Sequence, residues 1–121
     1  MTQSPYTQSA DLQSDLIWLP RSIFFDPRFA KEPYSHFGAY LWLVSQAAPE
    51  DMRISVNGTA FELKRGQYVT TERALAERWM WSKSKVRRFL ADLAKNRLVT
   101  RQAACNATLI TIIDYKGGTR W

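Results

Sequence analysis

The stretch ERWMWSKSKVRRFLADLAKN, residues 77–96, combines an aromatic turn with a helix that is apolar on one side and basic on the other. Ser82 is a suitable N-cap for this helix, because a serine hydroxyl there can accept a hydrogen bond from the first turn. At 100° per residue, about one third of the helix circumference is apolar, and the residues there are Val86, Phe89, Leu90 and Leu93. The pattern predicts a helix that buries this side.

The opposite side of the predicted helix carries Ser84, Arg88, Ala91 and Lys95, flanked by Lys85 and Arg87. When a helix lies in the major groove of DNA, its N-terminal residues reach base edges and its outer face meets phosphates. Arginine can bind guanine through two hydrogen bonds, and lysine and serine can bind phosphate. The candidate DNA-binding residues on this helix are therefore Ser82, Lys83, Ser84, Lys85, Arg87, Arg88 and Lys95.

The positive charge of the chain is concentrated around this helix. The 121 residues carry a net charge of +6, which favours an acidic partner such as nucleic acid or an anionic membrane surface. Between Lys64 and Arg101 there are eleven Lys and Arg against three Asp and Glu, whereas the remainder has six against eight. A basic helix face is often only a solvated face. The uneven distribution nevertheless favours double-stranded DNA as the partner.

Four further patterns flank the basic helix. Residues 34–48 predict a helix capped by Ser35, with Phe37, Tyr40, Leu41, Val44 and Ala48 at core spacing. Residues 53–63 predict a hairpin whose turn is Asn57-Gly58, and a short strand follows at 67–69. Thr70 or Thr71 caps a helix in which Leu75 and Trp79 lie four residues apart. Two β-branched runs joined by the letters ACNA, residues 104–107, predict a closing hairpin.

This order of elements predicts an α+β fold that is mainly helical: a winged helix-turn-helix with an extra N-terminal extended segment and an extra β-hairpin. The wing is expected around Ala103 to Ala107, and Arg97 and Arg101, which flank its first strand, are further candidate phosphate contacts. Trp79 and Trp81 are expected to be core side chains.

The domain is expected to span residues 18–116. Residues 1–17 are rich in Ser, Gln and Thr and predict a disordered or loose arm. Residues 117–121 are expected to be a tail that leads to an absent C-terminal region. No apolar run approaches the length of a membrane span or of a signal-peptide core, so no membrane partner is expected. The single cysteine, Cys105, excludes an internal disulfide and fits the reducing cytoplasm.

Catalytic patterns are weak in this sequence, and we expect no enzyme activity, metal or other cofactor. The only histidine, His36, lies in a predicted core helix, and Cys105 has no histidine near it in sequence. No Cys/His cluster has metal-ligand spacing, and no Gly-rich phosphate loop occurs. Glu72, Glu77 and Asp92 are expected to be ordinary i,i+4 partners of basic residues.

Several motifs within residues 18–115 together resemble the N-terminal winged-helix domain of phage and prophage replication proteins, of the replisome-organiser or replication-initiator type. The matching residues are Arg65-Gly66-Gln67, Leu75-Ala76 with Trp79, Trp81-Ser82, Lys85 to Leu90, and Leu109 to Ile113. Met80 stands where that family commonly has glycine. The resemblance implies DNA binding during replication in a bacterial host cell, with self-association into a homodimer and other replication proteins as further partners.

Two other functions fit the same residues. A transcriptional regulator could use the same DNA-binding domain, and sequence physics does not separate it from a replication protein. A winged-helix protein–protein module could instead present the basic face to an acidic partner. The steep salt dependence that phosphate contacts produce would distinguish DNA binding from the second alternative.

Overall fold

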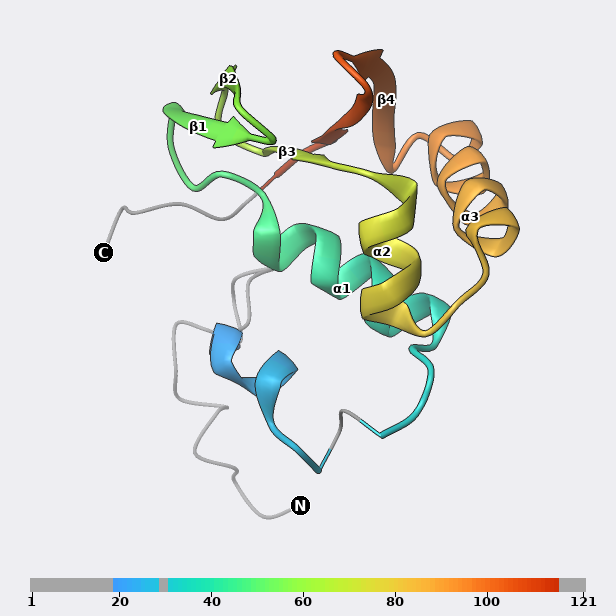
Figure 1. Ribbon diagram of the computed structural model, residues 1–121. Helices are drawn as coiled ribbons and strands as arrows, with labels where there is room; N and C mark the ends of the chain where they lie inside the picture. The colour runs from blue at the N-terminus through green and yellow to red at the C-terminus, as the bar shows by residue number, and fades with distance from the viewer. Residues whose placement is uncertain (1–18, 29–30, 116–121) are drawn as a thin grey trace, which may run out of the picture.

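The computed structural model describes residues 19–28 and 31–115. The arm expected at residues 1–17 and the tail expected at 117–121 lie outside these ranges. Within them the fold is α+β, as expected, with three α-helices and two small antiparallel sheets (Figure 1). The elements in chain order are η3, a 3₁₀ helix (Arg21–Phe25), α1 (His36–Gln46), β1 (Met52–Val56), β2 (Thr59–Leu63), β3 (Gln67–Thr70), α2 (Glu72–Trp79), α3 (Lys83–Lys95), β4 (Val99–Ala104) and β5 (Ala107–Ile112).

Helix α1 begins where the sequence predicted but buries a different side. The Ser35 hydroxyl accepts a hydrogen bond from the Gly38 N–H at 3.0 Å, which confirms the expected cap. The buried residues of α1 are Ala39, Trp42 and Leu43, while Phe37 is 71% exposed. Of the predicted core set, Ala48 is buried and Tyr40 and Val44 pack partly buried against the core, whereas Phe37 was predicted wrongly. Nearly every residue from 37 to 44 is apolar. The spacing of apolar residues therefore cannot predict which side of α1 is buried. Packing against the rest of the molecule decides it.

Helices α2 and α3 are joined by Met80, Trp81 and Ser82. The Thr71 side chain caps α2 by accepting from the Ala74 N–H at 3.0 Å, and the Ser82 side chain caps α3 by accepting from the Lys85 N–H at 3.1 Å. Met80 has φ 59° and ψ 42°, the left-handed conformation that glycine adopts most easily. Met80 therefore makes the tight turn that the family resemblance associates with glycine.

The main core lies between the helices and one face of a three-stranded sheet whose strand order is β3-β5-β4. The side of α3 predicted to be buried is buried, from Val86 to Leu93. These side chains belong to one cluster with Leu75 and Trp79 of α2 and with Val99, Ile110 and Ile112 of the sheet. Helix α3 is thereby fixed along its whole apolar side.

The β1–β2 hairpin packs on the other face of this sheet. Its turn is Asn57-Gly58, with φ of 50° and 82°, and Ile54 lies opposite Phe61 as the alternation predicted. A second cluster joins Leu63 of β2 to Val69 of β3 and to Ala48, with Leu109 of β5 packed against it. The three-stranded sheet is therefore a middle layer between the helices and the hairpin (Figure 1).

No helix within residues 19–28 and 31–115 combines the length and the apolar character that crossing a bilayer requires.

Candidate nucleic-acid interface

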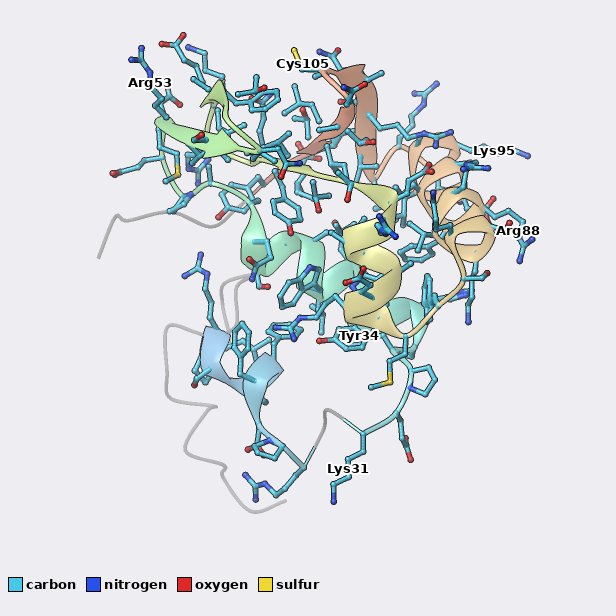
Figure 2. The ribbon with its side chains drawn as sticks, viewed as in Figure 1. Lys31, Tyr34, Arg53, Arg88, Lys95 and Cys105 are labelled. Carbon is cyan, nitrogen blue, oxygen red and sulfur yellow. The ribbon has the colours of Figure 1, made fainter. Side chains whose placement is uncertain are left out.

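The outer side of α3 is exposed and basic. Its exposed side chains include Lys83, Ser84, Arg87, Arg88 and Lys95, while the apolar side is buried. Figure 2 shows Arg88 and Lys95 pointing outward from α3, away from the other two α-helices. Lys83 and Lys95 are twelve residues apart, which corresponds to about 18 Å along a helix at 1.5 Å per residue. The structure thus presents basic side chains from one end of α3 to the other on this side, with the exposed Asp92 among them.

Ser82 and Lys85, two of the predicted DNA-binding residues, make contacts within the protein at the start of α3. The Ser82 hydroxyl oxygen accepts the capping hydrogen bond from Lys85. The Lys85 ammonium lies 4.4 Å from the centre of the Trp81 ring, and Lys85 is only half-exposed. A cation above an aromatic face is stabilised there. Both residues therefore help to fix the start of α3. The Ser82 cap was predicted from the sequence, whereas Lys85 was assigned there to DNA contact alone.

Arg87 is exposed but ion-paired with Glu72 of α2. The Arg87 Nη2 donates to Glu72 Oε1 at 2.9 Å, and Nε lies 3.3 Å from each carboxylate oxygen. The pKa of the Glu72 carboxyl is lowered because Arg87 donates hydrogen bonds to it, and the charges of Lys83 and Arg101 add to this effect. The structure therefore gathers three predicted cations around one carboxylate.

The expectation that Glu72 has an i,i+4 partner is wrong, because its partner lies fifteen residues away on the next helix. Glu72 is the first residue of α2, and the packing of α2 on α3 brings it close to Arg87 and Lys83. Glu77 does pair as expected, with Arg73 at 3.8 Å. The spacing of charges on one helix indicates only local pairs, so the Glu72–Arg87 pair could not be found from it.

A hollow lies beside this ion pair, where the starts of α2 and α3 meet the β4–β5 turn. It is lined by Thr71, Glu72, Arg73, Lys83, Asn106, Ala107 and Thr108. Sequence reasoning missed Arg73, Asn106 and Thr108 as members of the basic surface. The one sequence signal for Arg73 was its position just after the cap of α2. The start of a helix attracts anions such as phosphate, so a basic residue there can belong to the same surface.

The predicted arginines of the closing hairpin differ in their positions. Arg101 lies two residues after the buried Val99 on β4, so it shares the face of the sheet that is turned toward the helices. Arg97 is exposed and has φ 61° just after α3 ends, so it lies at the opposite end of α3 from Lys83. The structure brings Arg101 to the charge cluster around Glu72 and leaves Arg97 beside Lys95.

The hairpin turn itself forms as predicted. Cys105 and Asn106 have φ of 48° and 65°, which is typical of a two-residue hairpin turn. Cys105 is exposed at the tip of the hairpin (Figure 2). Among residues 19–28 and 31–115 no group of three or more His, Cys, Asp and Glu is arranged to hold a metal ion.

The aromatic residues of the α2–α3 turn are buried. Trp79 is 0% and Trp81 is 8% exposed, which confirms the prediction that both are core side chains. Their rings meet Phe89 edge to face, with centroids 5.7 and 5.2 Å apart. His36 lies on the outside of this cluster, 5.1 Å from the Phe89 ring. The rings of Trp79, Trp81 and Phe89 pack against the buried side of α3 and are not available to stack on bases.

No protein-family model matches the chain, and comparisons with curated proteins and with solved structures likewise gave no match.

Proposed function

We propose that this protein is a double-stranded DNA-binding module of the winged helix-turn-helix type, with α3 in the major groove. The observation that carries the proposal is the division of α3 into a buried apolar side and an exposed basic side. The order α1, β3, α2, α3, β4, β5 and the sheet order β3-β5-β4 support it, because they place a hairpin beside the second helix of the pair.

In this proposal the start of α3 meets the bases and its outer face meets the phosphates. Lys83, Ser84 and Arg88 are exposed and lie within the first two turns of α3, where the groove-bound helix of such proteins makes its contacts. Arg101 on β4 and Arg73 at the start of α2 extend the cationic surface beyond α3. The β4–β5 hairpin then acts as the wing.

We further propose that the module acts in phage or prophage DNA replication in the cytoplasm of a bacterial host, on the strength of the sequence resemblance. A transcriptional regulator would use the same surface, with α3 and the wing in the same positions. The two roles differ in where the bound DNA sites lie, which protection mapping across the DNA around the gene would show.

A salt titration of binding to a fluorescent duplex tests the DNA-binding proposal. Affinity should fall linearly on a log–log plot, with a slope of about −0.9 for each neutralised phosphate. Arg88→Ala should weaken binding to all sequences and reduce the slope by about one. Among residues 19–28 and 31–115, Arg88 has no side-chain hydrogen-bond or ion-pair partner, so its loss removes an outward charge only.

Arg53→Ala is the control for the loss of an exposed arginine, because Arg53 lies on β1 at the other side of the molecule (Figure 2), where it pairs with Glu62 at 2.7 Å. It should bind duplex as the unmodified protein does. Absence of duplex binding at about 50 mM salt, or an equal loss in the two variants, would reject the proposal. Binding to an acidic protein surface without duplex binding would favour the protein–protein alternative.

A further inference from the structure

The Glu72–Arg87 pair leaves one particular edge of the arginine free. A guanidinium carries five N–H donors, one on Nε and two on each Nη. Glu72 faces the edge formed by Nε and Nη2. The Nη1–Nη2 edge is left over, and the Arg87 side chain is 59% exposed. Within the described residues Nη1 makes no hydrogen bond.

We propose that Glu72 is a positioning residue that holds Arg87 so that its free edge binds one guanine in the major groove. Guanine presents N7 and O6 side by side there, and two parallel N–H donors fit this pair of acceptors. The Nη1–Nη2 edge supplies two such donors. This inference rests on the proposed DNA binding and assigns different tasks to the two neighbouring arginines of α3.

The carboxylate is itself well held. Glu72 is the first residue of α2, where the partial positive charge of the helix start stabilises an anion. Its side chain is only 25% exposed, and α2 and α3 are packed together through the main core. A carboxylate fixed in this way restricts the rotation of Arg87 before DNA arrives. Arg88 has no such restraint and can follow phosphates of any sequence.

Because its two charges cancel, the Glu72–Arg87 pair should affect discrimination between bases without affecting general affinity for DNA, and both quantities can be measured. Glu72 cancels the charge of Arg87, so the pair adds little to the general attraction for phosphates. A positioning role therefore predicts that removal of the carboxylate lowers discrimination between bases while general affinity for DNA stays the same or rises. A merely structural role predicts that both fall together.

The first experiment selects preferred duplexes from a library with a randomised central segment. Each position of a selected duplex is then substituted in turn and its affinity measured. The unmodified protein should require guanine at one position, and Glu72→Gln should reduce that preference by about fivefold or more. The affinity of Glu72→Gln for an unrelated duplex should not fall. Glu77→Gln is the matched control, because Glu77 is also an α2 glutamate paired with an arginine but within its own helix.

The second experiment changes the DNA and the arginine. Replacing the required guanine with 7-deazaguanine removes the N7 acceptor. The affinity of the unmodified protein for this duplex should fall by about the same factor as that by which Glu72→Gln reduces the preference for guanine. Arg87→Lys should lose the guanine preference and keep the salt slope, since lysine retains the charge but not the planar fork. These two measurements decide the question even if Glu72→Gln is poorly folded by circular dichroism.

The outcomes separate the two proposals. Failure of the unmodified protein to bind any duplex would reject both DNA binding and the role of Glu72. Salt-dependent binding that Arg88→Ala weakens, together with an unchanged guanine preference in Glu72→Gln and Arg87→Lys, would reject only the role of Glu72. A selected site with no required guanine would also reject it.

Discussion

The indole N–H of Trp81 donates a hydrogen bond to the carbonyl oxygen of Tyr34 at 2.8 Å. The N–H of Tyr34 donates in turn to the Trp79 carbonyl at 2.9 Å. The segment before α1 is thus bound to both sides of Met80, in the turn between α2 and α3. Because this turn sets the angle at which α3 leaves α2, the exposed basic side depends on residues far away in the sequence.

Trp81→Phe should therefore destabilise the protein. Phenylalanine keeps an aromatic ring against Trp79 and Phe89 but leaves the half-buried Tyr34 carbonyl without its donor. We expect a loss of about 1–3 kcal/mol in the free energy of unfolding, measured by urea denaturation followed by circular dichroism. An unchanged unfolding midpoint would show that this hydrogen bond contributes nothing.

The left-handed conformation of Met80 gives a second prediction. A non-glycine residue in this region is strained by about 1–2 kcal/mol, and Met80 is half-exposed, so its side chain offsets little of that. Met80→Gly should be more stable than Met80→Ala by about 1 kcal/mol in thermal unfolding. The alanine variant is the proper reference, because both changes remove the methionine side chain. Equal stability of the two variants would contradict the assigned turn.

The two sides of α3 should respond differently to truncation. Leu90 is fully buried, so Leu90→Ala should cost about 2–5 kcal/mol of unfolding free energy. Arg88→Ala, two positions earlier on the exposed side, should change stability by about 0.5 kcal/mol or less. Chemical denaturation of both variants tests the assignment of faces, and the assignment fails if Arg88→Ala is the more damaging change.

The Glu72–Arg87 pair should make stability depend on pH. The pKa of Glu72 is lowered in the folded protein, so its contribution is present above the ordinary glutamate value of 4.5 and is lost as the pH falls through the lower folded value. Glu72→Gln should be less stable than the unmodified protein at neutral pH, by about 0.2–1 kcal/mol for a partly exposed pair. The difference in melting temperature should vanish in acid. A difference that stays constant down to the acid range would show that the carboxylate charge is not its source.

The local features of the molecule follow from short stretches of sequence. Ser35, Thr71 and Ser82 cap the three helices by accepting hydrogen bonds from N–H groups three residues further on. A few letters therefore locate the starts of α1 and α3 and narrow the cap of α2 to Thr70 or Thr71. The Asn57-Gly58 turn similarly sets the register of β1 and β2. The faces of α3 were predictable because its apolar and basic residues separate cleanly at the helical period.

The sequence alone thus determined where the helices and hairpins begin, and which side of α3 is apolar, because those features depend on hydrogen bonds and periodicity within a few residues. Only the tertiary structure decided which side of α1 is buried, that Lys85 lies on Trp81, and that Glu72 holds Arg87. These relationships join elements whose distance in space is set by the packing of the whole core, and no local pattern specifies that distance.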